Sequence, residues 1–432
     1  SIGGGGGNGG SASTGAAGNG TPSNPMPTTL NLALGATGGL GGAGNAVDVT
    51  TWSPVKTKGN NSGAIVAQSI GGGGGHTGIA INLDVITTTT QAANVTHASG
   101  GTGGGGGDAW DVSINQSGNI TTTGPQSEAI YLASIGGGGG VVGYSYANFL
   151  GDKSYNFALG ANGGSGGDAK EVKGYFNYNT APSAGSTIST TGVFSDAIFA
   201  QSVGAGGGAT TGFHNQVQAG GRFGTLMQLG ASRSGSGGDG ESITLYTGGA
   251  ITTGGEAASG IFSQSVGGGG GKATAGILTP GPTITLPFIN LQLSTGGGLA
   301  ISPNGTSGTS TTILEGLMNL PSSSTLGTGA SIQLGGMASS SGDGGDINVY
   351  STSQISTKGN MSDGIKSESI GGGGGFSAMS DIRSGSPFAG AAVYLGGGGS
   401  GGGNGGSIYL QQQYTIETQG NLSSGMLAQS IG

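Results

Sequence analysis

The chain of 432 residues has no cysteine, few charged residues and no long apolar run. Without cysteine, neither a disulfide framework nor a thiolate metal site can form. No run of 18 apolar residues occurs, so we expect no helix that spans a membrane. Charged residues make up 7% and the net charge is −8, which leaves no basic surface for nucleic acid.

The chain also lacks a starting methionine and a signal peptide. It begins Ser1-Ile2-Gly3 and ends in the same tripeptide, Ser430-Ile431-Gly432. Both ends therefore fall inside a repeat, and we expect the sequence to be a piece of a longer protein.

Glycine is abundant instead, with 107 residues, about a quarter of the chain. Such a composition without a strict Gly-X-Y period is typical of low-complexity or disordered segments. Here, however, Ile, Val, Leu and Thr recur at fixed offsets. The glycines therefore punctuate a series of short strands.

The repeat is marked by the tripeptide Ser-Ile/Val-Gly, which starts at Ser1, Ser69, Ser134, Ser202, Ser265, Ser369 and Ser430. Successive intervals lie between 61 and 68 residues, except for one of 104 that carries an insertion. They divide the chain into modules 1–75, 76–140, 141–208, 209–271, 331–375 and 376–432, with a variable insertion at 272–330. A constant spacing of ten residues inside every module leaves no room for a variable loop there.

Within each module, apolar residues alternate with polar or small ones over three to six positions, as expected for short half-buried strands. The expected repeat core has an apolar column, Ile65, Ile130, Ile198, Ile261, Ile365 and Met426, and a serine column, Ser69, Ser134, Ser202, Ser265, Ser369 and Ser430. Another conserved pattern, apolar-x-Leu-Gly, opens five modules at Leu32, Phe157, Met227, Ile332 and Val393, and is degraded to Asn82-Leu83-Asp84 in the second.

These patterns predict an all-β fold, an elongated β-solenoid resembling a parallel β-helix, built from six glycine-rich modules. A module of three or four short strands cannot bury its apolar face alone, so neighbouring modules must cover one another. With ~20 residues per rung and about 4.8 Å per stacked layer, the body would be on the order of 100 Å long. A bundle of polyglycine-II helices with short β-strands is the alternative.

The five-glycine runs Gly71–Gly75, Gly136–Gly140, Gly267–Gly271 and Gly371–Gly375 have a constant length, which a flexible linker would not need. Ordering five glycines costs much entropy, so contacts must compensate for it. The runs are either tight corners with positive φ or extended segments of polyproline-II type that lie side by side and pair through their backbones.

Two strings carry a family resemblance: Gly63-Ala64-Ile65-Val66-Ala67-Gln68-Ser69-Ile70 before a five-glycine run, and Ser195-Asp196-Ala197-Ile198-Phe199-Ala200-Gln201-Ser202-Val203. They resemble the glycine-rich repeats in passenger regions of large Gram-negative autotransporters and related adhesins. The resemblance spans essentially the whole chain. It implies secretion across the outer membrane, a β-helical passenger, and adhesion, cell-surface or biofilm roles.

Candidate chemistry is sparse. His76, His97 and His214 share no repeat column, so neither catalysis nor metal binding is expected of them. The set Asp108, Asp168, Asp239 and Asp346 recurs once per module, whereas a calcium-binding β-roll needs an Asp every nine residues. We therefore expect Asx turns at these positions, with calcium binding as the alternative. Tyr131, Phe199 and Phe262 occupy one column. They could form an exposed ladder that contacts carbohydrate or another partner, but side-by-side packing of the rings is the simpler interpretation.

We therefore expect a non-enzymatic, extracellular structural or adhesive protein without cofactor or metal, outside a Gram-negative outer membrane, as a surface fibre or a passenger segment. Expected partners are further copies of itself in a fibre or array, and a host surface or glycan. Ice binding or glycan binding is the alternative. Against ice binding, the Thr of each Val/Ile-x-Thr-x-Gly segment shares its face with the leading apolar residue and should point inward.

Overall fold

The computed structural model describes the chain at residues 1–18, 29–34, 36–77, 80–86, 94–99, 102–141, 145–150, 153–159, 162–209, 214–218, 223–229, 234–273, 277–279, 290–293, 299–302, 328–334, 338–377, 381–382, 391–395 and 399–432. Nearly all regular structure in these residues is β-strand. One short 3-10 turn, Pro182–Ala184, interrupts it in the third module.

In the described part of the chain, five parallel sheets of six strands each form the stack, and every sheet takes one strand from each turn of the chain. We name each sheet after its first strand. The β3 sheet contains β3 (Val47–Thr51), β8 (Val112–Gln116), β13 (Val172–Phe176), β18 (Ile243–Thr247), β26 (Ile347–Ser351) and β32 (Ile408–Gln412). The β4 sheet contains β4 (Val55–Thr57), β9 (Ile120–Thr122), β14 (Thr187–Thr190), β19 (Ala250–Thr253), β27 (Gln354–Thr357) and β33 (Ile416–Thr418). The β5 sheet contains β5 (Ile65–Ile70), β10 (Ile130–Ile135), β15 (Ile198–Val203), β20 (Ile261–Val266), β28 (Ile365–Ile370) and β34 (Met426–Ile431).

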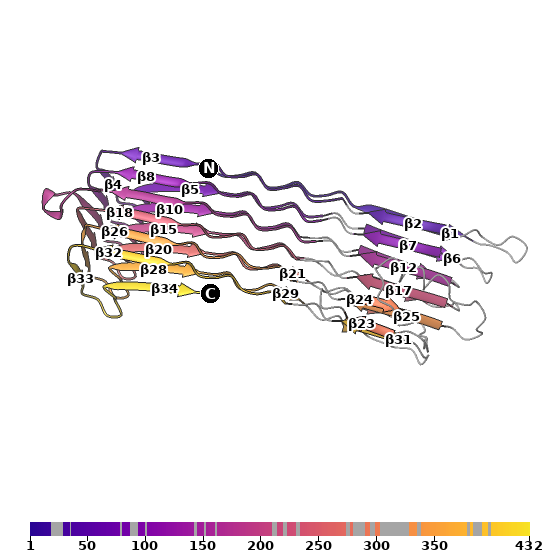
Figure 1. Ribbon diagram of the computed structural model, residues 1–432. Coiled ribbons are helices and arrows are strands. Elements are labelled where there is room, and N and C mark those ends of the chain that lie inside the picture. Colours follow the sequence, from indigo (N-terminus) through magenta and orange to yellow (C-terminus); the bar gives the residue numbers. More distant parts are fainter. Residues whose placement is uncertain are drawn as a thin grey trace, which may run out of the picture.

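Two further sheets stand at the other end of the molecule (Figure 1). The β1 sheet contains β1 (Ala12–Gly18), β6 (Ala80–Ile86), β11 (Ser145–Leu150), β16 (His214–Gln218), β22 (Ile277–Thr279) and β30 (Asp381–Ile382). The β2 sheet contains β2 (Thr29–Leu34), β7 (Asn94–Ser99), β12 (Lys153–Leu159), β17 (Phe223–Leu229), β25 (Thr328–Leu334) and β31 (Ala391–Leu395). Small pairs join β21 (Lys272–Ala273) to β29 (Phe376–Ser377) in parallel, and β23 (Asn290–Leu293) to β24 (Leu299–Ser302) antiparallel.

The fold is thus a parallel β-solenoid, as predicted, but one module makes one rung. Ile130 pairs with Ile65 on one side and Ile198 on the other, so equivalent residues lie a whole module apart. The expected rung of about 20 residues, and with it the body of about 100 Å along the stack, is wrong. Six layers at ~4.8 Å give a stack on the order of 25 Å thick. The long dimension runs across the rungs, along the glycine-rich segments that join the two groups of sheets in Figure 1.

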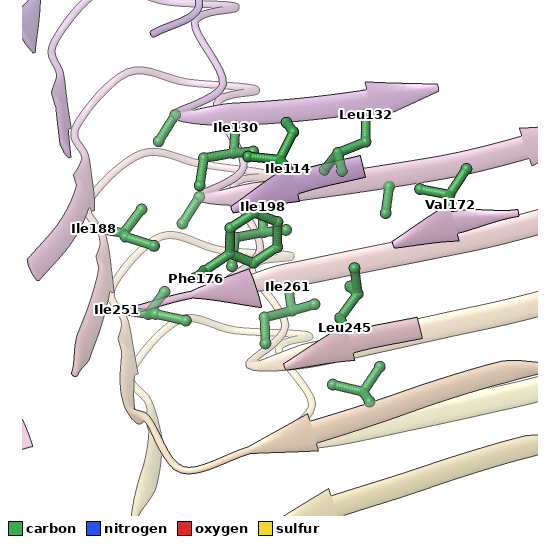
Figure 2. Packing of buried hydrophobic residues seen from close by; sticks show 14 of the residues in the cluster. Ile114, Ile130, Leu132, Val172, Phe176, Ile188, Ile198, Leu245, Ile251 and Ile261 are labelled. Atoms are coloured by element: carbon green, nitrogen blue, oxygen red, sulfur yellow. The ribbon is translucent and has the colours of Figure 1, made fainter. Parts of the chain in front are cut away.

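The β3, β4 and β5 sheets enclose the hydrophobic core, where equivalent side chains from successive rungs stack in columns (Figure 2). Ile130, Ile198, Ile261 and Ile365 are fully buried, because each lies between two rungs. Ile65, on the edge strand β5, is also buried but keeps 7% exposure. Met426 belongs to the last rung and is 43% exposed. A second column contains Ile114 and Leu245, and its third-rung member is Gly174. The buried ring of Phe176 fills the space that a side chain at Gly174 would need.

The glycine-rich segments form two layers. We call residues such as Gly71–Gly75 the outgoing runs and residues such as Gly103–Gly107 the return runs. Backbone hydrogen bonds recur at every third residue, the period of a polyproline-II helix: Gly71 and Gly74 donate to the next rung of their own layer, at Ile135 and Gly138. Gly72 and Gly75 donate instead to the return layer, at Gly42 and Gly39.

A continuous zigzag of hydrogen bonds links the two layers. It begins with Gly42 donating to Gly4 and Gly72 to Gly42, and continues rung by rung to Gly403 donating to Gly372. The layers come so close that a Cβ at Gly71 or Gly136 would lie about 1.8 to 1.9 Å from a return-run carbonyl. In the third rung, Ala205 stands where the other outgoing runs have glycine. Its N–H donates to the Gly167 carbonyl at 3.1 Å, whereas the equivalent Gly137 N–H donates to Gly107 at 2.8 Å.

Of the two interpretations of the glycine runs, the paired extended one is right and the positive-φ corner is wrong. Among the described glycines, only Gly118, Gly185 and Gly249 have positive φ, and none lies in a run. The fold therefore combines the predicted solenoid with the local structure of its alternative, because backbone pairing without side chains offsets the entropy of ordering glycine.

Register corrects two expectations about the repeat. Leu32 and Phe157 pair with His97, so the second copy of the apolar-x-Leu-Gly opening is His97-Ala98-Ser99 in β7, whereas Asn82-Leu83-Asp84 lies in β6. The segment 272–330 is also not wholly an insertion. Its start, β22, pairs with β16 and β30, and its end overlaps β25.

Candidate functional site

The serine column joins rungs through their backbones. The hydroxyl of Ser134 accepts a hydrogen bond of 2.8 Å from the Lys170 N–H of the next rung and donates one of 3.1 Å to the Trp110 carbonyl of its own rung. In the same way, the Ser202 hydroxyl accepts a hydrogen bond from the Glu241 N–H and donates one to the Lys170 carbonyl. A buried hydroxyl thus takes the place of a missing backbone pair, which gives the most regular residue of the repeat a structural role.

The threonines of the β4 sheet point inward and fix a turn. Thr122, Thr190 and Thr357 are buried, and each hydroxyl donates to the carbonyl of a serine five residues later. The predicted inward direction is therefore confirmed in these copies, and the hydroxyls are unavailable to any surface ligand.

The most regular outward surface lies on the β5 sheet and continues onto the outgoing runs. We call it the neutral face and define it by four rows of equivalent residues. The first three rows are Val66, Tyr131, Phe199, Phe262, Lys366 and Leu427; Gln68, Ala133, Gln201, Gln264, Glu368 and Gln429; and Ile70, Ile135, Val203, Val266, Ile370 and Ile431. Among these residues, Ala133 is itself buried. The fourth is the row of run-centre glycines Gly73, Gly138, Gly206, Gly269 and Gly373.

Interactions along the rows tie the neutral face together. Phe199 stacks on Tyr131 at 5.2 Å and on Phe262 at 4.9 Å between ring centroids. The Lys366 Nζ lies 4.7 Å from the Phe262 ring centre and forms an ion pair of 3.0 Å with Glu368. Phe199 lies between two rings, and Phe262 lies between Phe199 and this cation, so these two rings offer no free face on which a sugar could stack.

The glutamine row is also internally bonded. Gln201 donates to Gln264 and Gln264 donates to Glu368, both at 3.0 Å. The one charged pair in these rows neutralises itself. The neutral face is therefore a pre-ordered surface of aromatic edges, amides, branched aliphatic side chains and bare glycine.

The other side of the stack is acidic. Nine of the 19 acidic residues lie on the return runs and the β3 sheet: Asp48, Asp108, Asp111, Asp168, Glu171, Asp239, Glu241, Asp343 and Asp346. A tyrosine ladder crosses this side, with Tyr246 stacked at 5.0 Å on both Tyr175 and Tyr350. We call this side the acidic face, and its charge asymmetry with the neutral face is not visible in the linear sequence.

The aspartate column differs from the predicted one. Register places Asp343, not Asp346, with Asp108, Asp168 and Asp239: each Oδ1 accepts a bond of 2.8 to 3.0 Å from the backbone N–H of the next member. The carboxylates therefore bond between rungs and do not cap turns of their own, which corrects the Asx-turn expectation. Within the described residues, no group of three or more His, Asp or Glu side chains could hold a metal ion.

One half-buried carboxyl has an unusual environment. Asp196, in the turn before β15, accepts a hydrogen bond of 2.6 Å from the Ser259 N–H. Burial, which outweighs this hydrogen bond, raises the pKa of Asp196 to about 7, and the nearby Glu128 adds to the rise. Glu128, Lys366 and Asp363 are the charged groups that act on it, so its protonation is coupled to the turn before β15.

Comparisons with known proteins give no information on the function of this chain. No protein-family model, no curated protein and no solved structure matches the chain. Among the described residues, no helix is long and apolar enough to cross a bilayer.

The predicted core residues fall into two parallel columns of the β5 sheet and not into a pocket. The serines of the five inner positions, Ser69, Ser134, Ser202, Ser265 and Ser369, are buried, and Ser430 of the last rung is exposed. His97 in β7 and His214 in β16 lie in different sheets, opposite Phe157 and Tyr146, so these two histidines share no column. The His76 Nδ1 accepts a hydrogen bond from the Val141 N–H. Sequence reasoning missed the neutral face, although the outward columns of the β5 sheet carry its signal.

Proposed function

We propose that this protein is a non-enzymatic structural and adhesive repeat segment, displayed outside a Gram-negative outer membrane as part of an autotransporter passenger or surface fibre. The supporting observation is the neutral face. Its rows are fixed by stacking and hydrogen bonds before any partner arrives, so little side-chain entropy remains to be lost on contact. The residues that recur in every rung bond to backbone, which suits a scaffold better than a catalyst.

The charge asymmetry supports an oriented role in adhesion. The acidic face stays hydrated and repels other acidic surfaces, whereas the neutral face has no net charge to desolvate. Adhesion through the neutral face would therefore leave the acidic face toward the medium. Glycan binding is the alternative partner class, through the amide groups of the glutamine row and the Tyr131 hydroxyl, since the faces of Phe199 and Phe262 are covered.

The proposal is tested by measuring attachment of the purified chain to host-cell monolayers and to abiotic surfaces. Introducing negative charge on the neutral face, with Gln201→Glu and Gln264→Glu, should reduce attachment at least tenfold. The matched control on the acidic face, Thr244→Glu with Asn348→Glu, should leave it unchanged. Attachment that is equal in all three proteins, or absent in the parent chain, would refute the adhesive role.

Location and partner class need separate measurements. Antibody labelling of intact producing cells, with and without external protease, should show the chain outside the outer membrane. A glycan array distinguishes a sugar ligand from adhesion to surfaces in general. Ice-recrystallisation inhibition should be negative, because the inward threonines cannot order water at a surface.

A further inference from the structure

We propose that the bare glycine row of the neutral face is a docking surface for a second copy of this chain. The inference deepens the self-assembly part of the proposed function and rests on it. It starts from the backbone of the outgoing runs, which have one side against the return layer and the other side open.

The direction of each peptide group follows from the hydrogen bonds that are made. The Gly72 carbonyl accepts a bond from Gly107 of the return layer, and Gly75 donates to Gly39 in that layer. In a trans peptide the N–H and C=O point in opposite directions. The Gly73 N–H and the Gly74 carbonyl therefore point away from the return layer, toward the outside.

The same arrangement recurs along the stack. Within the described chain, the N–H groups of the run-centre glycines Gly73, Gly138, Gly206, Gly269 and Gly373 have no hydrogen-bond partner. Outward carbonyls lie beside them in each rung. The surface thus presents free N–H donors and carbonyl acceptors side by side in a regular lattice. A second copy of the same surface could pair its donors with these acceptors and its acceptors with these donors.

Nothing covers this lattice sterically. A Cβ built at Gly138 or Gly373 would meet no atom within 4 Å, so these positions are glycine although the monomer has room for a side chain. The equivalent outer column of the return layer does carry side chains, among them Leu40, Ser165 and Ser236. The absence of side chains is therefore specific to the outgoing layer, which indicates that another backbone approaches it.

The chain itself shows which backbone fits. Its outgoing and return runs travel in opposite directions and already pair through glycine backbones at 2.7 to 3.1 Å. A second copy, turned by a twofold axis parallel to the stack, presents its own outgoing runs in the same antiparallel sense. Such a contact uses the same surface on both copies, as a twofold dimer requires.

The flanking residues fit this pairing. The branched aliphatic row of one copy, which includes Ile135 and Val203, would lie against a row of the other copy that is apolar in three of five rungs. That row is His76, Val141, Ala209, Lys272 and Phe376. The acidic faces would lie on the two outer sides of the dimer, where they do not repel each other closely. The neutral face would be covered in the dimer, so self-association and attachment compete for it. A dimer of this kind has four glycine layers at its centre and leaves both ends of each stack free.

The first test is sedimentation velocity of the chain over a range of concentrations. The parent should sediment as a dimer. The double variant Gly138→Leu with Gly206→Leu, whose side chains have room in the monomer, should weaken association at least tenfold. The control Ser165→Leu with Ser236→Leu, on the outer return layer, should dimerise like the parent, and circular dichroism should show all three folded.

Single cysteines give a second test, because the parent chain has none. Gly138→Cys should form an intermolecular disulfide readily under mild oxidation, and Ser165→Cys should not. A monomeric parent, association that survives in the Gly138/Gly206 variant, or equal cross-linking of both cysteines would overturn the proposal. Association that survives would point to end-to-end stacking of rungs instead.

The two proposals fail separately. A chain that attaches to surfaces but sediments as a monomer would refute the docking surface and keep the adhesive function. A glycine-dependent dimer that attaches to nothing would keep the docking surface and refute adhesion.

Discussion

The hydroxyl of Ser134 lies between two rungs and accepts a hydrogen bond of 2.8 Å from the backbone N–H of Lys170. The Trp110 carbonyl in turn accepts the hydroxyl proton at 3.1 Å. Neither backbone group pairs directly with the other, so this side chain completes the ladder between the second and third rungs. The serine of the tripeptide that defines the repeat therefore bridges two backbone groups that do not pair with each other.

Removing such a hydroxyl should destabilise the stack. Ser202→Ala leaves the Glu241 N–H and the Lys170 carbonyl without their partner, and buried unpaired polar groups cost about 1 to 3 kcal/mol each. We expect the free energy of unfolding to fall by ~2 kcal/mol in urea titration. Ser165→Ala, on the surface, is the control and should change it by less than about 0.5 kcal/mol. Equal effects of both substitutions would contradict the bridging role.

Two neighbouring glycines should respond oppositely to the same substitution. A Cβ at Gly136 would lie 1.9 Å from the Gly167 carbonyl, whereas a Cβ at Gly138 meets nothing. Gly136→Ala should therefore separate the glycine layers and lower the melting temperature strongly. Gly138→Ala should be neutral or raise stability by about 0.4 to 1 kcal/mol, since alanine restricts the unfolded chain. Thermal unfolding followed by circular dichroism distinguishes the two, and similar losses would rule out the two-layer packing.

Stability should depend on the protonation of Asp196. Its pKa is raised to about 7 by burial, so the folded state binds the proton more tightly than the unfolded state, in which the pKa is ordinary. The favourable contribution is complete below about pH 4 and is lost as the pH rises through about 7.

The measurement is the free energy of unfolding across this interval for parent and Asp196→Asn. Asparagine keeps an oxygen for the Ser259 N–H and cannot ionise, so it should remove most of the decline, on the order of 3 kcal/mol. Asp111→Asn, on the exposed acidic face, should leave the profile as it is in the parent. A parent whose stability is flat between about pH 5 and 8 would disprove the assignment.

A strained turn offers a stabilising substitution. Phe194 has φ of 52° and its side chain is 60% exposed, and Met361 and Leu422 have the same left-handed conformation in later rungs. Phe194→Gly should stabilise the fold by ~1 kcal/mol, because glycine adopts this conformation without strain. Val193→Gly, one residue earlier with ordinary φ, should destabilise it. The opposite order in chemical denaturation would contradict the strain.

The strands and their inward columns could be predicted because alternation is a local property. A residue such as Ile198 or Thr190 shows its face by the residues on either side of it. The interval of ten residues between the two strands likewise excluded a variable loop. The serine column could be found in the same way, although its partners could not, since Lys170 follows Ser134 by 36 residues and varies from copy to copy.

The neutral and acidic faces could not be predicted, because each gathers residues from segments that are distant in the chain. Asp343 joins Asp239 only through a register set by the layers, and the spacing of glycines and aspartates suggested Asp346 instead. The length of a rung was misjudged for the same reason: a strand pattern does not tell whether the chain turns back after 20 residues or after a whole module.

The sequence alone determined that this chain consists of stacked β modules with alternating inward residues, since side-chain chemistry and a period of two act over a few residues. The tertiary structure decided that one module closes one rung, that glycine runs pair in two layers, and that one outer glycine row stays open. Those features depend on which backbone groups meet across the stack, and glycine, having no side chain, carries no local signal of its neighbours.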